Sequence, residues 1–257
     1  MNSISMSLSN NWSYLMKEYK MTNKWREIWN KKNLKSDKDF TLHDLIIADG
    51  FDTGIGSYDE KKWGQLVLDF LVRSKLKKNT NILEIGCGSG AFLYALNNMI
   101  PCNFYGIDYS NSMIAMAQKV LPHASFSATE ANAMVFNNVE FDIIFSHSVF
   151  HYFPDQAYAR QVLDTWCRRL KRGGKLVLLD LNDKAHENSY YAKRMLNYRN
   201  PETYKADYDG LDHLFFDKIE LTHLLSQHEM GEVCFFPHAV SEYGNSEFRF
   251  NLMCVKN

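Results

Sequence analysis

The chain has 257 residues, of which 29 are basic and 30 acidic, so its formal net charge at pH 7 is only −1. This length suits one α/β domain with an appended cap or lid better than two separate domains. The near-zero charge argues against the basic surface that binding to DNA or another polyanion requires. We therefore expect a small-molecule substrate and no nucleic-acid partner.

The five cysteines are scattered along the chain without a C-x-x-C pair. They predict neither a zinc site nor a disulfide framework. The histidines show no regular spacing with acidic residues, so no metal site is expected. The first residues do not resemble a secretory signal, and no run of about 18 apolar residues occurs. We expect a cytoplasmic protein without membrane insertion, and a homo-oligomer is compatible with these features.

Apolar residues at spacings of three and four predict amphipathic helices over residues 12–30. A glycine-rich loop follows from Asp49 to Tyr58. The next helix is expected to bury Trp63, Leu66, Val67, Phe70 and Leu71. These segments predict an N-terminal helical cap over residues 1–75, followed by the main domain over residues 76–257.

From residue 79 onward, short apolar runs alternate with helical stretches, which predicts βαβ units and a parallel sheet. The predicted strands are Asn81–Ile85, Asn103–Ile107, Ser125–Ala128, Phe141–Ser146 and Lys175–Leu181. The predicted helices are Ala91–Met99, Ser112–Val120 and Asp155–Leu170. The sequence Lys171–Gly174 is expected to stop the last helix.

The alternation ends after the fifth strand. Residues 182–217 are polar and tyrosine-rich, which predicts a lid insertion, and a helix returns at Lys218–His228. Two β-like runs, Glu232–Val240 and Glu247–Val255, are joined by Tyr243–Ser246, which is typical of a hairpin turn. The fold class is therefore α/β, with a seven-stranded sheet of five parallel strands plus a C-terminal antiparallel hairpin.

A glycine loop follows the first predicted strand. Gly86, Gly88 and Gly90 alternate directly before a helix, so the backbone can turn tightly and approach a ligand. Gly86, Gly88 and Ala91 also fit the G-x-G-x-x-A pattern of dinucleotide-binding proteins. The loop predicts a nucleotide-like ligand without deciding which one.

Asp108 lies 18 residues after Gly90, at the end of the second predicted strand. A carboxylate at this place can accept both hydroxyl protons of a ribose, in NAD as well as in S-adenosylmethionine. Met113 begins the next helix and is expected to pack on the adenine. Glu84 is an ionisable residue at the end of a buried strand, and it needs a cationic or hydrogen-bonding partner.

These residues, with two later segments, resemble class I S-adenosylmethionine-dependent methyltransferases. Glu84 to Gly90 resembles the E-x-G-x-G-x-G motif of that family, and residues 129–136 resemble its G-D-A-x-x-L-P-F segment, with Glu130 where the family usually has Asp. Residues 141–153 resemble its F-D-x-x-x-S-x-x-V-L-H-H segment. The four elements, including Asp108, cover residues 80–153 in the family's order.

The resemblance implies a Rossmann-like fold with S-adenosylmethionine as cofactor. It places Glu84 near the amino-acid end of the cofactor and Glu130 at the adenine amino group. Tyr58 is expected to close over the cofactor and shield the sulfonium. The complete set of expected cofactor-binding residues is Tyr58, Glu84, Gly86, Cys87, Gly88, Gly90, Asp108, Tyr109, Met113, Glu130, Ala131, Ser146 and His147.

Methyl transfer to an alcohol benefits from a general base, and His is the usual choice. His151 is the first candidate, because it follows the fourth strand at the edge where ligands bind, and His147 is the second. The alternative for His151 is a packing role near the cofactor. Expected substrate-binding residues lie in the lid and carry aromatic or cationic groups suited to a phosphate or carboxylate: Tyr190, Arg194, Tyr198, Arg199, Tyr204 and His213.

Three alternative functions remain open from the sequence. An NAD-dependent oxidoreductase shares the glycine loop and Asp108, although Glu84 and Glu130 argue against it. An RNA methyltransferase lacks support, because residues 146–149 replace the N-P-P-Y-like tetrapeptide of enzymes that methylate nucleic-acid amino groups. A non-catalytic cofactor-binding protein is the third.

Two flanking segments, Trp25–Trp29 and Asp49–Gly54, resemble methyltransferases encoded among bacterial surface-polysaccharide genes. This resemblance implies O-methylation of a sugar, phosphate or phosphoramidate precursor in capsule or lipopolysaccharide biosynthesis.

Overall fold

The computed structural model describes residues 24–32, 39–52, 56–196, 202–204 and 208–257. Its helices are α2 (Lys24–Lys31), α3 (Leu42–Ala48), α4 (Glu60–Ser74), α5 (Ala91–Asn97), α6 (Asn111–Val120), α7 (Gln156–Cys167), α8 (Glu187–Leu196) and α10 (Lys218–Ser226). Its strands are β1 (Asn81–Ile85), β2 (Asn103–Asp108), β3 (Ser125–Ala128), β4 (Phe141–His147), β5 (Leu170–Asn182), β6 (Cys234–Phe236) and β7 (Arg249–Val255). Short 3-10 turns lie at Phe150–Tyr152, Lys184–His186 and Ser246–Phe248.

The seven strands form one sheet in the order β3-β2-β1-β4-β5-β7-β6. Strands β1 to β5 are parallel, and β7 runs antiparallel to both β5 and β6. The predicted fold class is therefore confirmed. The strand order reverses between β1 and β4, and in open α/β sheets such a reversal opens a crevice at the carboxyl ends of the strands.

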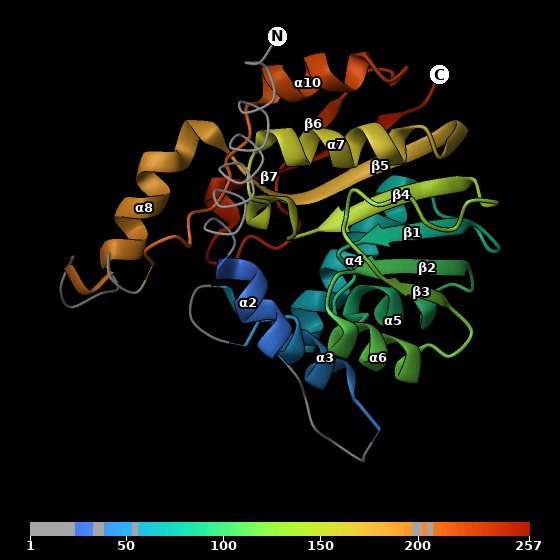
Figure 1. The fold of residues 1–257 in the computed structure, drawn as a ribbon, viewed down its shortest axis with the longest axis horizontal. Coiled ribbons are helices and arrows are strands. Elements are labelled where there is room, and N and C mark those ends of the chain that lie inside the picture. Colours follow the sequence, from blue (N-terminus) through green and yellow to red (C-terminus); the bar gives the residue numbers. More distant parts are fainter. Residues whose placement is uncertain (1–23, 33–38, 53–55, 197–201, 205–207) are drawn as a thin grey trace, which may run out of the picture.

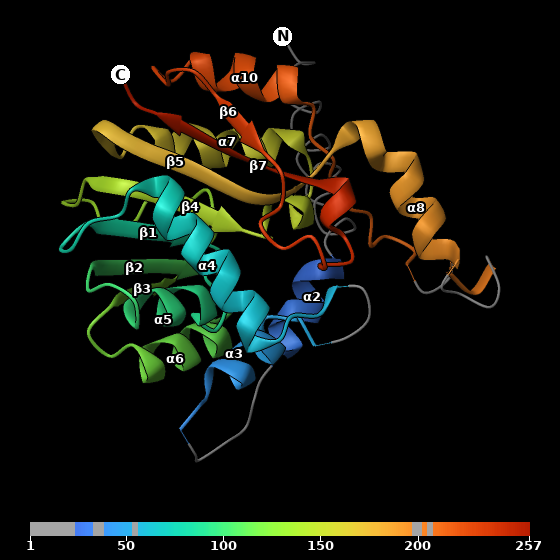
Figure 2. The same cartoon turned by 180° about the vertical axis from the view of Figure 1, so that it is seen from behind.

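Helices cover both faces of the sheet, with α4 and α7 on opposite sides (Figures 1 and 2). Neighbouring residues of a strand point to opposite faces, so Ile82 packs in the core that α3 to α6 cover, and Leu83 packs in the core that α7 and α10 cover. Burial on both faces explains why the parallel strands are continuously apolar in the sequence.

The N-terminal helices α3 and α4 share the sheet's own core. Leu45 of α3 and Trp63 of α4 are buried with sheet and α5 residues. Each helix begins at a polar cap: Thr41 forms a capping box with Asp44, and Asp59 accepts from the backbone of Lys62. The division into a cap over 1–75 and a domain over 76–257 stays a prediction. Much of the amphipathic segment predicted for residues 12–30 lies outside the described residues.

Three local predictions differ from the structure. Helix α7 ends at Cys167, and Lys171–Gly174 belongs to β5 instead of forming the helix stop. Gly173 has a φ of 75° and Gly174 lies against the carbonyl oxygens of Lys171 and Phe141, so the two glycines form an irregularity within the strand. The polar 182–217 segment contains helix α8, whose single buried residue, Tyr190, leaves little apolar periodicity to detect.

The predicted C-terminal hairpin is also looser than expected. Strand β6 has three residues, and residues 237–248 connect it to β7. His238 and Tyr243 turn inward in this connection, where the Tyr58 hydroxyl lies 2.9 Å from His238 Nε2.

Among the described residues, no helix is both long and apolar enough to cross a membrane.

Candidate active site

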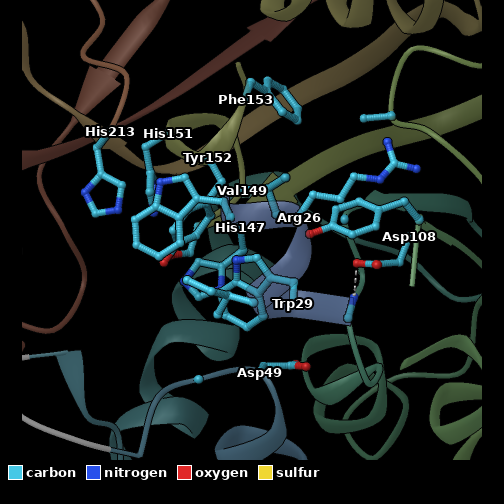
Figure 3. A pocket seen from close by; sticks show the side chains of 18 of the residues that line it. Arg26, Trp29, Asp49, Asp108, His147, Val149, His151, Tyr152, Phe153 and His213 are labelled. Carbon is cyan, nitrogen blue, oxygen red and sulfur yellow. Dashed lines mark hydrogen bonds between the residues drawn. The ribbon is translucent and has the colours of Figure 1, made fainter. Parts of the chain in front are cut away.

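A cavity of about 1390 Å³ opens at the carboxyl ends of β1, β2 and β4. Its walls also include helix α2, the loop after α3, and residues from α8, the 208–213 segment and the start of β7. Figure 3 shows Asp49 and Asp108 at one end, His151 and His213 at the other, and His147 between them. This is where the strand order predicts a ligand site.

The glycine loop after β1 forms one wall of the cavity. Gly86, Gly88 and Gly90 all have positive φ values, of 73°, 52° and 85°. A Cβ on Gly86 would lie 2.5 Å from a methyl group of Val149, and a Cβ on Gly88 would lie 2.4 Å from Asp49 Oδ1. Glycine is therefore required at both positions by conformation and by space.

Three carboxyl groups gather around this loop. Asp108 accepts from the backbone N–H of Gly88 at 3.0 Å and of Ser110 at 2.9 Å. Asp49, at the end of α3, accepts from Ser89 N–H at 2.7 Å. Glu84 is 3% exposed, and its Oε2 atom has no hydrogen-bond partner among the described residues.

Burial raises the pKa of all three groups, to about 7 for Asp49, to about 6 for Asp108 and well above the ordinary value for Glu84. The mutual repulsion of the carboxylates adds to the shift, since Asp49 and Asp108 both raise the pKa of Glu84. Among the described residues Lys32 partly offsets this repulsion at Asp49, and the pKa of Asp49 is nevertheless raised.

The predicted adenine region lies beside this cluster. Tyr109, Met113, Glu130 and Ala131 all line the cavity. Glu130 is already engaged, because Arg26 of α2 lies 2.5 Å from Oε1 and the Tyr158 hydroxyl donates to Oε2 at 3.1 Å. Arg26 also lies over the Tyr109 ring. A contact from Glu130 to an adenine amino group would have to share the carboxylate with these two partners.

His147 ends β4 in the middle of the cavity. Its ring stacks on Phe51, meets Trp63 in an edge contact and lies tilted against Phe92. Burial lowers the pKa of His147 to about 4, so its imidazole is neutral at physiological pH. The Nε2 atom has no partner among the described residues.

The opposite end of the cavity is rich in hydrogen-bond donors. Arg249 donates to His151 Nδ1 at 2.9 Å and to the Asp180 carbonyl oxygen at 3.0 Å. Because arginine only donates, Nδ1 of His151 is the acceptor and the ring hydrogen lies on Nε2. Burial and the Arg249 charge hold the pKa of His151 well below its usual range.

A second arginine builds the neighbouring part of this end. Arg194 Nη1 donates to the Tyr190 hydroxyl, and it lies 3.3 Å from Nδ1 of His213. The Tyr190 hydroxyl lies 2.6 Å from the same Nδ1 atom. Nε2 of His213 and Nε of Arg249 are buried without partners among the described residues. Two arginines and neutral imidazole N–H groups therefore face this end.

The structure brings most of the predicted site residues to the cavity wall: Glu84, Gly86, Cys87, Gly88, Asp108, Tyr109, Met113, Glu130, Ala131, His147, His151, Tyr190, Arg194 and His213. Four others lie elsewhere, for identifiable reasons. Gly90 caps α5 against Ala117, and Ser146 donates to the Ile85 carbonyl oxygen. Tyr58 stacks behind Tyr243, and Tyr204 stacks on Tyr208. Tyr198 and Arg199 lie outside the described residues.

Several wall residues escaped the sequence reasoning, above all Trp25, Arg26, Asp49 and Arg249. Arg249 carried a usable signal, because a charged residue beginning an apolar strand needs a buried partner, as Glu84 does. Asp49 precedes Gly50 at a helix end and looks like an ordinary turn residue. The described residues contain no group of three or more potential ligands that could hold a metal ion.

Comparisons with known proteins agree with this geometry. Residues 83–178 match the family described as "Methyltransferase domain". A demethylmenaquinone methyltransferase from Thermotoga maritima is 29% identical over 143 residues, which are 55% of this chain and 56% of that protein. The chain spans about half the length of the curated relatives that it matches first.

Two solved structures share the fold. An S-adenosylmethionine-dependent methyltransferase from Clostridium acetobutylicum superposes with a TM-score of 0.57 at 14% identity, over 84% of this chain and 96% of that one. Phosphoethanolamine N-methyltransferase 2 from Haemonchus contortus, in complex with phosphomonomethylethanolamine and S-adenosylhomocysteine, gives 0.58 at 14% identity, over 85% and 58%. The matches agree with the predicted methyltransferase class and cofactor.

Proposed function

We propose that this protein transfers a methyl group from S-adenosylmethionine to a small acceptor that carries a phosphate or carboxylate group. The observation that carries the proposal is the division of one cavity into two chemically opposite ends. Carboxylates gather at the glycine loop, and arginine and imidazole donors gather at the far end. A cationic cofactor and an anionic acceptor would each meet the complementary charge.

The carboxylate end fits the cofactor. Asp108 would accept the ribose hydroxyls, and the unpartnered Oε2 of Glu84 would accept from the ammonium group. When bound, S-adenosylmethionine supplies an electrophilic methyl group. The protein holds the acceptor against that methyl group and excludes water, and such positioning alone lowers a barrier by about 7 to 11 kcal/mol.

The donor end fits an anion. Arg194 presents a cation over the rings of Tyr190 and Tyr208, and Arg249 lines the same cavity, with a buried Nε that has no partner among the described residues. The Haemonchus contortus enzyme, of similar fold, was solved with phosphomonomethylethanolamine, which is itself a phosphate-bearing acceptor. A sugar, phosphate or phosphoramidate precursor of a capsule or lipopolysaccharide is the acceptor class we favour, supported by the resemblance of Trp25–Trp29 and Asp49–Gly54.

Two measurements test the proposal. Calorimetry should detect binding of S-adenosylmethionine and no binding of NAD at the same concentration. Release of S-adenosylhomocysteine should then be assayed with sugar phosphates, nucleotide sugars, phosphoramidates and phosphoethanolamine, each paired with its uncharged counterpart. Equal turnover of the charged and uncharged members of the pairs would contradict the assignment of an anionic acceptor.

Arg194→Leu should raise the acceptor KM by about 10- to 100-fold, because a hydrogen bond to a charged group contributes about 1.5–3 kcal/mol. The dissociation constant of S-adenosylmethionine should stay within about twofold, since Arg194 lies at the far end. Arg168→Leu is the control, because Arg168 is exposed at the end of α7 and does not line the cavity. An unchanged KM in Arg194→Leu would remove this residue from the acceptor site.

His151 is expected to act as a hydrogen-bond donor, since Arg249 occupies its Nδ1 atom. His151→Gln keeps an N–H donor and should retain at least about a tenth of the turnover, whereas loss of a general base costs about 10²- to 10⁴-fold. His147, whose Nε2 has no hydrogen-bond partner among the described residues, is then the imidazole that we propose as base. A loss of more than 100-fold in His151→Gln, with unchanged cofactor affinity, would return the base to His151.

A further inference from the structure

The backbone amides of the glycine loop are all engaged within the protein. Gly86 and Cys87 donate to the Ile107 carbonyl oxygen at 2.8 and 2.9 Å. Gly88 donates to Asp108 at 3.0 Å. Ser89 donates to Asp49 at 2.7 Å, and Gly90 donates to the Cys87 carbonyl oxygen at 2.8 Å. Residues 86–90 therefore offer no amide donor to a ligand.

This arrangement is the reverse of a phosphate-binding loop. In dinucleotide-binding proteins the amides at the start of the helix after the first strand face the pyrophosphate. Here the Asp49 carboxylate lies at the amide of Ser89, two residues before α5 begins. A carboxylate thus occupies the place where such proteins hold an anion.

The position of Asp49 is built by the surrounding structure. Asp49 caps the end of α3, and its own N–H bonds back to Leu45 and Ile47 carbonyl oxygens. The Ser89 hydroxyl donates to the Leu45 carbonyl oxygen at 3.1 Å, which ties the loop to the same helix end. Only glycine at residue 88 leaves room for the carboxylate, since a Cβ would lie 2.4 Å from Oδ1.

We propose that Asp49 determines cofactor specificity by filling the anion position of the glycine loop, so that the site rejects diphosphate-bearing nucleotides and favours a cofactor with a sulfonium charge. The inference rests on the proposed function. It gives the N-terminal segment a direct part in the cofactor site. It also explains why a loop whose sequence fits the dinucleotide pattern lines a cavity end that is acidic.

The charges around Asp49 support this role. Glu84 of β1 and Asp108 of β2 are acidic groups near Asp49 that repel its negative charge. Among the described residues whose charges shift the pKa of Asp49, the cation is Lys32, which follows α2. Lys32 is shared with Asp52. The buried Oε2 of Glu84 has no partner in the described part of the chain, which independently marks a place for a ligand donor. A cation would relieve the repulsion among the three carboxyl groups.

The test compares S-adenosylmethionine with S-adenosylhomocysteine, which lacks the sulfonium charge. Asp49→Asn keeps the shape and an acceptor oxygen for Ser89 but removes the charge. We expect the preference for S-adenosylmethionine over S-adenosylhomocysteine to fall about tenfold in this variant, measured as the ratio of dissociation constants at pH 8. Asp52→Asn removes the same charge from an exposed residue nearby and should leave the ratio within about twofold.

Two further readouts accompany the ratio. Asp49→Ser should free the Ser89 amide and raise the affinity for ADP at least about fivefold over the wild type. In the wild type, the dissociation constant of S-adenosylhomocysteine divided by that of S-adenosylmethionine should increase from pH 6 to pH 8. The reason is that Asp49, with a pKa of about 7, deprotonates in this range. The increase should be smaller in Asp49→Asn. This comparison subtracts the titration of Glu84, Asp108 and the ligands themselves.

The inference would be overturned if Asp49→Asn changed the affinities for S-adenosylmethionine and S-adenosylhomocysteine equally, so that their ratio matched the ratio in Asp52→Asn. The thermal unfolding midpoint of each variant shows whether that variant is folded. If Asp49→Asn does not fold, the same comparison of the two dissociation constants is made with Asp49→Ser. Failure of the wild type to bind either ligand would instead contradict the proposed function. The two failures are therefore distinguishable.

Discussion

Asp108→Ala should weaken binding of S-adenosylmethionine by at least about 100-fold. The carboxylate of Asp108 accepts from Gly88 and Ser110 N–H groups, which holds the glycine loop, and it is the proposed acceptor for the ribose hydroxyls. Each hydrogen bond to a charged acceptor contributes about 1.5–3 kcal/mol, and two ribose bonds together exceed 2.7 kcal/mol, or about 100-fold. Calorimetry with S-adenosylhomocysteine should show the same loss, because the ribose is common to both ligands.

The matched control is Asp69→Ala, which removes an aspartate from an exposed ion pair with Arg73 on α4. Its effect on cofactor affinity should stay within about twofold, because neither Asp69 nor Arg73 lines the cavity. Surface ion pairs contribute only about 0–1 kcal/mol to stability, so the variant should also stay folded. Asp108→Asn should fall between wild type and alanine, because its amide oxygen still accepts one bond. Wild-type affinity in Asp108→Ala would remove this residue from the cofactor site.

Arg249→Met should lower the free energy of unfolding by about 3–5 kcal/mol and abolish measurable turnover. Arg249 is buried beside Asp180, with Nη1 3.6 Å from Oδ2, and removing it leaves a buried carboxylate without its cation. Breaking one partner of such a pair costs about this amount. Turnover should vanish because the same guanidinium holds His151 and faces the acceptor end.

The double variant Arg249→Met with Asp180→Asn separates the two effects. Removing the stranded charge should restore most of the stability in urea unfolding, while turnover stays absent because the guanidinium is still missing. Arg73→Met is the surface control, since Arg73 pairs with Asp69 on an exposed helix face. Recovery of turnover in the double variant would show that Arg249 acts through stability alone.

The cofactor end was predictable because its signals lie within one continuous stretch. Glu84 and Asp108 lie at the carboxyl ends of β1 and β2, the glycines follow β1 directly, and parallel strands bring these ends to one edge. The central strands were predictable because burial on both faces makes β1 and β4 clear apolar runs. Local pattern and tertiary position coincide there.

The acceptor end was far less predictable, because segments distant in the sequence assemble it. Arg249 lies 98 residues from His151, and His213 lies 23 residues from Tyr190. Helix α8 contributes one buried residue, so tertiary contacts rather than amphipathic periodicity hold it. The ion pair between Arg26 and Glu130 joins the first described helix to the loop after β3, and no local pattern specifies such a contact.

Helix α2 touches both ends of the cavity, so we expect it to couple the two ligands. Arg26 pairs with Glu130 at the cofactor end, and Trp25 stacks on His213 at 4.8 Å at the acceptor end. Yet α2 has eight residues and buries none of them, so it is too short to be stable by itself. A ligand that contacts α2 from either end of the cavity would hold the helix in place, and the second ligand would then meet a wall already fixed. Cofactor and acceptor should therefore bind with positive cooperativity, each raising the affinity for the other by the same factor.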